Sequence, residues 1–406
     1  MSGPKASFFL FCLYMMRRMR NGDPIYASEQ QALRRTLAMR MEDFARAHIA
    51  PRTDLRDHDI IPDDLWQGFS AAGLTGVGLP KEHGGHGGDY RAIVMVAEAL
   101  AAIGGVKGVV TSWMSREVVA RLQISRLCND NQRAEFLPKL ASGEMTPCVA
   151  ISEPGAGAHP KHLKTTATRD GDDFIINGEK AYLTNGPIAD LFLILAITGE
   201  ENGRKQFSVL MTPRDAPGLE LTEGVKIDFL HPAPHCGLKL TNVRVSAANM
   251  LGPEGDAFPA ISLPMRRVED VLAAASTAGA LHHELAQFAK ELGRGVLDDD
   301  DMAELGWLAA APAGLSAMAQ HAAELLDLEH NHGADSDADE ISNIAAAARD
   351  WSRLQQGRIG ALIDKSGLVA STGLAAERRD LEKTLGIARS AHVIQARRRA
   401  AALMDT

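Results

Sequence analysis

Two histidines and a cysteine, at His231, His235 and Cys236, form the densest group of metal-binding residue types in the sequence. Imidazole and thiolate are ligands that suit Zn²⁺. Prolines between the two histidines exclude a helix that would bring them onto one face, and no fourth ligand is evident nearby. We therefore predict that the chain has no metal site.

A second segment with chemical potential is the glycine-rich run over residues 151–158, which contains Gly157. Glycine has no Cβ, so it lets backbone approach a bound ligand closely. By itself, the same run is also typical of an ordinary β-turn. The sequence contains no P-loop, no H-E-x-x-H and no G-x-G-x-x-G that follows a strand. These absences give no support to the corresponding nucleotide-binding and metalloprotease sites.

Composition excludes further classes of protein. The 406 residues carry 43 Lys and Arg against 52 Asp and Glu, a net charge of −9. Nucleic-acid binding depends on neutralising phosphates, so an acidic chain argues against it. The 4 cysteines are widely spaced and form no C-x-x-C pair. This pattern suits reduced thiols, and we expect a cytoplasmic protein.

The first 23 residues contain an apolar run over residues 7–16, followed by Arg17, Arg18 and Arg20. A bilayer span needs about 20 apolar residues, and in a signal peptide the basic residues precede the apolar run. We predict that residues 1–23 are a leader outside the fold, either disordered or packed on the surface, or an over-extended start. A weak membrane contact is the alternative, and no membrane span is expected.

Hydrophobic periodicity divides the rest of the chain into three parts. In residues 24–145, Ser28 and Gln31 form a capping box, and a helical spacing of apolar residues follows. Further helices are predicted at residues 62–72, 90–102, 112–127 and 131–141. In residues 146–254, Asp170-Gly171 and Asn177-Gly178 are hairpin signals between alternating strands. Residues 255–406 predict four helices, at 268–292, 302–328, 341–363 and 374–404.

Four motifs in this order resemble those of the acyl-CoA dehydrogenase family. Residues 73–85 resemble its G-L-x-G-x-x-x-P-x-x-x-G-G element, and residues 151–158 its T-E-P-G-x-G-S signature. Residues 177–186 are similar to its N-G-x-K block, and residues 238–252 to its strand ending in L-G. The resemblance covers residues 40–280 and fades beyond 290. It implies an α+β fold with an N-terminal α-helical domain, a barrel-like middle β-domain and a C-terminal four-helix bundle.

The resemblance also implies a bound FAD. In the family, backbone amides and a hydroxyl of the β-domain contact the edge of the flavin ring. A hydroxyl that donates to flavin N5 suits hydride transfer, because negative charge develops there. Ser152 replaces the family's usual threonine and keeps the hydroxyl. The residues carried over to the FAD site are Val149, Ile151, Ser152, Gly157, Tyr182 and Thr184, and Ala158 is carried over to the substrate site.

Desaturation of an acyl thioester needs a carboxylate that removes a proton from Cα. Most family members place this Glu late in the chain, where this sequence has Ala388 or Arg389. Other members place it on the first helix of the last domain. Aligning the Ala-rich residues 274–279 with the family puts Glu269 there, with Asp270 in place of a substrate-binding arginine. Arg266 and Arg267 lie one turn earlier and are assigned to substrate binding. A solvated helix carboxylate is the alternative interpretation of Glu269.

A further departure concerns FAD affinity. The family completes its FAD site with R-x-Q-F-G and Q-x-x-G-G segments from the neighbouring subunit. Here the first position, residues 294–301, ends in four aspartates, and the second, residues 360–367, lacks the pattern. Aspartates near a pyrophosphate repel it, by up to a few kcal/mol where solvent does not screen them. FAD is therefore predicted to bind weakly, to be lost, or to need a different partner chain.

The resemblance thus implies an FAD-dependent oxidoreductase that desaturates an acyl-CoA or acyl-carrier thioester in fatty acid metabolism. Electrons would leave through an electron-transfer flavoprotein, and the protein would form a homodimer or homotetramer. Two alternatives stay open. One is a catalytically lapsed subunit that forms a hetero-oligomer with an active paralogue. The other is the same fold used for a different reaction on a carrier-bound acyl group.

Overall fold

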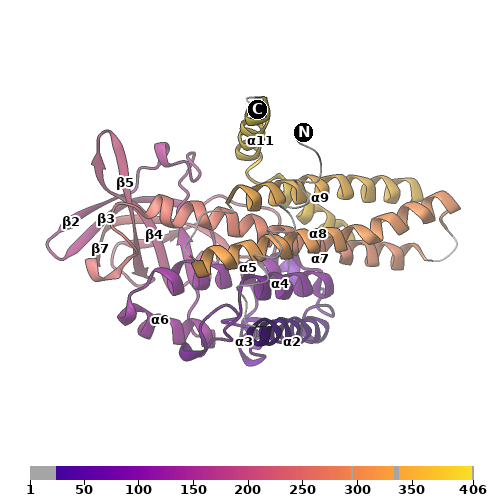
Figure 1. Ribbon diagram of the computed structural model, residues 1–406, viewed down its shortest axis with the longest axis horizontal. Helices are drawn as coiled ribbons and strands as arrows, with labels where there is room; N and C mark the ends of the chain where they lie inside the picture. The colour runs from indigo at the N-terminus through magenta and orange to yellow at the C-terminus, as the bar shows by residue number, and fades with distance from the viewer. Residues whose placement is uncertain (1–23, 294–295, 333–337, 405–406) are drawn as a thin grey trace, which may run out of the picture.

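The computed structural model describes residues 24–293, 296–332 and 338–404. The predicted leader, residues 1–23, lies outside the described residues. Helices precede residue 147, strands occupy the region from 147 to 251, and helices follow (Figure 1). This order confirms the predicted α+β class. The domain boundaries after residues 145 and 254 remain predictions about separately folding units.

The first helical region differs from the sequence prediction at two helix starts. Helix α2 begins at Pro24 rather than after Ser28, because proline suits the first helical position, where its missing N–H is not needed. Helix α5 begins at Lys107, five residues before the predicted start, and continues as a π-helical turn over Val119–Ser125. The helices are α2 (Pro24–His48), α3 (Asp63–Ala71), α4 (Tyr90–Gly104), α5 (Lys107–Val118) and α6 (Asp130–Ser142).

The strands form one sheet in the order β6-β7-β3-β2-β4-β5-β8, with β1 parallel to β4. The remaining ladders are antiparallel except for a short parallel contact between β2 and β4. The strands are β1 (Pro147–Ala150), β2 (Thr166–Asp170), β3 (Asp173–Thr184), β4 (Leu191–Glu201), β5 (Arg204–Pro213), β6 (Leu219–Thr222), β7 (His235–Ser246) and β8 (Met250–Leu251).

Strand β4 is apolar on both faces because two separate cores cover it. Leu193 and Leu195 belong to a cluster with residues of α6, whereas Phe192 and Ile194 pack with Phe174 of β3 and with β7. Strands from both halves of the sheet thus share one interior cluster, so the sheet curls over itself. This explains why residues 191–197 form a continuous apolar run instead of an alternating one.

Five helices make up the C-terminal region in the described residues, and the predicted helix over residues 374–404 is two helices. Helix α10 ends at Gly386, and Ala388 has φ +55°, which a continuous helix does not permit. Figure 1 shows α7, α8 and α9 along the length of the molecule and α11 projecting from them. Their bounds are α7 (Leu263–Leu292), α8 (Asp299–His332), α9 (Ala338–Ser366), α10 (Thr372–Gly386) and α11 (Arg389–Met404).

The two helical regions share one hydrophobic core. Buried residues of α2, α4 and α5 belong to the same cluster as buried residues of α7, α8 and α9. Helices α4 and α7 approach so closely at Gly279 that a Cβ there would lie 2.3 Å from the carbonyl oxygen of Glu98. Close contact between α4, α5 and α7 fixes the helix faces that line a cavity at the junction with the sheet.

Candidate active site

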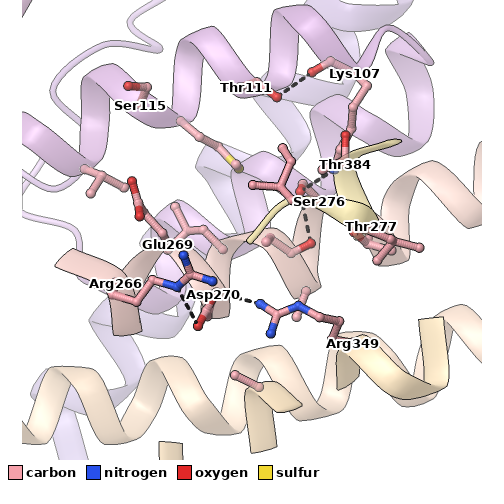
Figure 2. Close-up of a pocket in the computed structure, with 18 of the residues that line it drawn as sticks. Lys107, Thr111, Ser115, Arg266, Glu269, Asp270, Ser276, Thr277, Arg349 and Thr384 are labelled. Atoms are coloured by element: carbon pink, nitrogen blue, oxygen red, sulfur yellow. Dashed lines mark hydrogen bonds and ion pairs between the residues drawn. The ribbon is translucent and has the colours of Figure 1, made fainter. Parts of the chain in front are cut away.

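A cavity of about 300 Å³ lies where α5, α7 and α9 meet the end of β3. Its walls combine apolar side chains with hydroxyl and charged groups (Figure 2). Residues from Thr384 to His392, around the break between α10 and α11, close one side. The wall includes Lys107, Thr111, Met114, Ser115, Thr184, Arg266, Glu269, Asp270, Leu272, Ser276, Arg349 and His392.

Glu269 lines this cavity from α7, and Figure 2 shows its carboxyl group directed toward α5 near Ser115. Glu269 as a residue is solvent-exposed, while protein atoms crowd its carboxyl group. Burial raises the pKa of Glu269 to about 7, with Arg266 lowering it and Asp270 raising it. In the described residues, the carboxylate accepts no hydrogen bond. A carboxylate with this pKa in the wall of a cavity has the properties of a general base at neutral pH.

A charged network covers the cavity wall next to Glu269. Asp270 accepts hydrogen bonds from Arg266, with Nε 3.2 Å away, and from Arg349 of α9, 2.6 Å away. The two arginines also contact the two ring nitrogens of His392, at 2.8 and 2.7 Å. Burial, followed by the charges of Arg349 and Arg266, lowers the pKa of His392 to about 4, so its ring is neutral at pH 7. Two guanidinium groups therefore face one carboxylate, which leaves an excess of positive charge.

The two arginines assigned to substrate binding separate in the structure. Arg266 lines the cavity. Arg267 points elsewhere on α7 and pairs with Glu329 of α8, with 3.4 Å between the charged groups. Successive helix residues are rotated by about 100°, so both could not reach the same wall. The sequence assignment treated the pair as one unit, and the structure supports a cavity position for Arg266 alone.

The predicted flavin-contacting residues gather along the seam between β1 and β3. The Ser152 carbonyl accepts a hydrogen bond of 2.9 Å from the Ala181 amide, next to Tyr182. Lys180 donates to the Ile151 carbonyl at 3.1 Å. Val149 belongs to β1 itself and is half-buried. The structure thus brings Val149, Ile151, Ser152, Tyr182 and Thr184 to one edge of the sheet.

Only one of these residues reaches the cavity that contains Glu269. Thr184 borders it, and the Thr184 hydroxyl lies 3.1 Å from Nε2 of His235. Tyr182 is 49% exposed and lies outside the cavity wall. Ser152 and Gly157 are also absent from that wall, as is Ala158, which is exposed. Of the residues assigned to the FAD site, Thr184 alone lines this cavity.

The glycine-rich segment leaves room for a large ligand. Gly155 and Gly157 have φ of +71° and +57°, and a Cβ on either would meet no atom within 4 Å. The Glu153 carboxylate accepts hydrogen bonds from the Lys164 and Thr165 amides at 2.7 and 2.9 Å, which anchors the loop. Open backbone beside the seam, an exposed aromatic ring and a threonine that lines the cavity together fit a planar, hydrogen-bonding ring such as flavin.

The three candidate metal ligands do not share a site. His235 lies beside Thr184, and its Nδ1 is 2.9 Å from the Ala233 carbonyl oxygen. His231 lies near Asp59 at 3.6 Å, and burial raises the pKa of the Cys236 thiol to about 11. Within residues 24–293, 296–332 and 338–404, no three metal-binding side chains converge.

Sequence reasoning missed three wall residues. Arg349 and His392 come from α9 and α11, more than 70 residues after Glu269 in the chain, and nothing local marks them. Lys107 is buried at the start of α5. The predicted helix start at residue 112 placed Lys107 in a connecting loop instead. Gly105 was the available signal. Glycine often ends a helix, so a new helix could have been predicted to start soon after it.

Comparisons with known proteins agree with this geometry. The sequence model described as "Acyl-CoA dehydrogenase, N-terminal domain" matches residues 27–144, and "Acyl-CoA dehydrogenase, middle domain" matches residues 148–243. These regions coincide with the first helical region and the sheet. The chain therefore belongs to the acyl-CoA dehydrogenase family, whose members are oxidoreductases that use FAD.

Individual relatives extend the similarity into the last helices. An acyl-CoA dehydrogenase of Bacillus subtilis is 27% identical over 316 residues, 76% of this chain and 81% of the relative. Butyryl-CoA dehydrogenase of Megasphaera elsdenii has a TM-score of 0.76 at 21% identity, covering 92% and 98% of the two chains, and shows the fold alone. The prolyl acyl carrier protein oxidase AnaB has a TM-score of 0.70 at 25% identity, covering 87% and 93%.

None of the helices in the described part of the chain combines the length and apolar character that a bilayer crossing requires.

Proposed function

We propose that this protein is an FAD-dependent dehydrogenase that introduces an α,β double bond into an acyl thioester, with Glu269 as the catalytic base. The observation that carries the proposal is the position of Glu269, a carboxyl group with a raised pKa in the cavity that Thr184 borders from the sheet. Family membership supplies the reaction type, and this geometry supplies a proton acceptor. We also propose that the protein acts in the cytoplasm.

In this mechanism Glu269 removes the proton from Cα of the thioester. The pKa of about 7 means that a large fraction of the carboxyl is ionised at neutral pH and still basic enough to accept a proton. Arg266, whose charge lowers the pKa of Glu269, keeps part of the base ionised. FAD, when bound, supplies the acceptor for the hydride that leaves Cβ. Closure of the cavity by a thioester would exclude water and raise the basicity of Glu269 further.

The sheet edge would hold the flavin through the Thr184 hydroxyl and the backbone of residues 149–152, with Gly157 and Tyr182 alongside. Thr184 is well placed because it lines the same cavity as the base. His235, 3.1 Å from that hydroxyl, would fix its orientation. Burial lowers the pKa of His235, so its ring is neutral; Nδ1–H donates to the Ala233 carbonyl, and Nε2 accepts the Thr184 proton.

The four aspartates at residues 298–301 still predict weak FAD binding. In the structure they lie at the start of α8, where negative charge is favoured by the helix dipole. Lys365 of α9 pairs with Asp301 at 2.6 Å and with Asp298 at 3.8 Å. Titration of apo-protein with FAD, alone and with paralogues from the same genome, tests this. Tight stoichiometric binding by the lone protein would contradict the prediction of weak affinity.

The thioester carrier and the protein partners belong to the proposal as well. Coenzyme A is the carrier in the names of most relatives, whereas AnaB acts on an acyl carrier protein and is 25% identical to this chain. We propose an acyl-CoA or acyl-carrier thioester as substrate, a homodimer or homotetramer as the assembly, and an electron-transfer flavoprotein as the electron acceptor. A hetero-oligomer with an active paralogue remains the alternative if the lone protein is inactive.

The test of the proposed function is anaerobic mixing of FAD-loaded protein with a panel of acyl thioesters, on coenzyme A and on pantetheine. Pantetheine carries the arm that coenzyme A and carrier proteins share. Loss of the visible flavin absorbance, together with formation of the α,β-unsaturated thioester, is the expected result. Protein that binds FAD but is bleached by no thioester would reject the proposal and favour a lapsed subunit.

A further inference from the structure

Lys107 is a buried cation in the wall of the cavity, and the proposed mechanism gives it no role. Its side chain is 4% exposed, yet it borders the cavity from the first turn of α5. Its Nζ donates a hydrogen bond of 2.7 Å to the Ser276 hydroxyl of α7. The first turn of a helix favours negative groups, so local structure offers no reason for a lysine at this position.

The ammonium group of Lys107 lacks partners for most of its protons. A protonated lysine has three N–H donors. Of these, only the one to Ser276 has an acceptor in the described part of the chain, and no carboxylate there lies within 4.0 Å. Burial lowers the pKa of Lys107 to about 7, and the more distant Asp380 only partly opposes this. A buried cation without a counter-ion is costly, and an anionic ligand would remove the cost.

Lys107 and Glu269 lie at different ends of the cavity, as Figure 2 shows. Ser276, the partner of Lys107, follows Glu269 by seven residues on α7, which places both on one face of the helix about 10 Å apart along its axis. Met114 of α5 and Leu272 of α7 also line the cavity, and Leu272 lies between Glu269 and Ser276 along α7. The cavity thus has a base at one end, an apolar middle and a cation at the other end.

We propose that Lys107 binds a carboxylate at the far end of the acyl chain, so that the preferred substrate is an ω-carboxyacyl thioester. This inference rests on the proposed function, because Glu269 fixes where Cα of the substrate lies. The hydrocarbon middle of such a chain would contact Met114 and Leu272. Its carboxylate would accept the unused Lys107 protons and supply the missing counter-ion.

Paired thioesters of equal length test this substrate class. Glutaryl, adipyl and pimelyl thioesters are compared with pentanoyl, hexanoyl and heptanoyl thioesters, all on pantetheine and on coenzyme A, with ω-hydroxyhexanoyl as a neutral polar probe. Affinity is measured by calorimetry and kcat/KM by flavin reduction. Wild-type protein is expected to favour one of the acids over both neutral probes by about tenfold or more, the range for a hydrogen bond between charged groups.

Two variants separate recognition from helix packing. Lys107→Met removes the charge and keeps the length of the side chain, and it should abolish the preference for the acid. Ser276→Ala removes the bond between α5 and α7 but keeps the amine, and it should retain that preference. If Lys107 only ties the helices together, both variants will affect acid and neutral thioesters equally, which would overturn the proposal. Lys107→Gln serves the same comparison if Lys107→Met fails to fold, as judged by circular dichroism.

The readouts also distinguish failure of this inference from failure of the proposed function. Equal oxidation of acid and neutral thioesters by the wild type would reject the carboxylate site and leave the dehydrogenase intact. Preference for the ω-hydroxy probe over the acid would likewise reject it. If no thioester is oxidised, the proposed reaction fails, and binding then decides the inference. Selective, Lys107-dependent binding of the acid would uphold the site, and its absence would reject it.

Discussion

At the scale of single residues, the chemistry of this protein depends on how the cavity shifts the pKa of each titratable side chain in its wall. Glu269 has no hydrogen-bond partner in the described residues, and its pKa rises to about 7. His392 lies between two arginines, and its pKa falls to about 4. The same wall therefore holds a carboxyl group near its midpoint of ionisation and an imidazole that is neutral. Such opposite shifts in one site are typical of enzymes that transfer protons.

The pKa of Glu269 predicts the pH dependence of the reaction. A base must be deprotonated, so the rate of flavin reduction should rise with pH and level off above about 7, with a slope of about tenfold per pH unit on the acidic side. Single-turnover mixing under anaerobic conditions measures this rate. If the rate of flavin reduction stays constant from well below to well above pH 7, or falls as the pH rises, another group accepts the proton.

At the scale of secondary-structure elements, the break between α10 and α11 brings His392 to the cavity. Helix α10 ends at Gly386, and the chain turns through Ala388 before α11 begins. His392 is thereby placed against Arg266 and Arg349, on α7 and α9. The late position where most family members carry the base thus supplies a turn and a histidine instead of a carboxylate.

The positive φ of Ala388 predicts that glycine stabilises this turn. Left-handed backbone costs a non-glycine residue roughly 1–2 kcal/mol, so Ala388→Gly should strengthen the attachment of α11 by about 1 kcal/mol. Hydrogen exchange of the α11 amides should slow. The matched control is Ala396→Gly on the exposed face inside α11, which should accelerate exchange because glycine disfavours helix. Faster exchange in Ala388→Gly would contradict the assigned backbone conformation.

The sequence predicted most elements because periodicity and turn residues are local signals. It could place Glu269 on the first helix of the last region, since the Ala-rich residues 274–279 fix the alignment of α7. It could not predict the turn at Ala388, because alanine is a strong helix former and only Gly386 marks the end of α10. Arg349 and His392 were missed for a different reason. Their contacts depend on tertiary packing of α7, α9 and α11, which no local pattern encodes.

At the scale of the whole molecule, buried charges join the first and last helical regions. Asp327 of α8 accepts hydrogen bonds from the Tyr90 and Arg91 amides at the start of α4, at 2.7 and 3.3 Å. It also lies 3.6 Å from the Arg121 guanidinium group. These contacts link segments more than 200 residues apart. They lie in the part of the molecule that holds α4 against α7, the helix that carries Glu269.

Removal of the Asp327 carboxylate should destabilise the whole fold. Asp327→Ala leaves the Tyr90 and Arg91 amides without this acceptor and removes the carboxylate that faces Arg121, which costs about 3 kcal/mol in the free energy of unfolding. Denaturant unfolding monitored by circular dichroism measures the change. Asp350→Ala, on the exposed face of α9, is the control and should change stability by less than about 0.5 kcal/mol. Equal effects of the two variants would refute the proposed link between the helical regions.

The most direct test of the central claim is the rate of flavin reduction by a thioester substrate in Glu269→Gln, compared with wild type. Glutamine keeps the size and hydrogen-bonding groups of the side chain but is not basic. A positioned base contributes about 100- to 10,000-fold in rate. The account therefore predicts at least a 100-fold slower reduction, with FAD content and thioester affinity unchanged. Reduction by Glu269→Gln at the wild-type rate would contradict the account, because the proton would then leave Cα without this carboxylate.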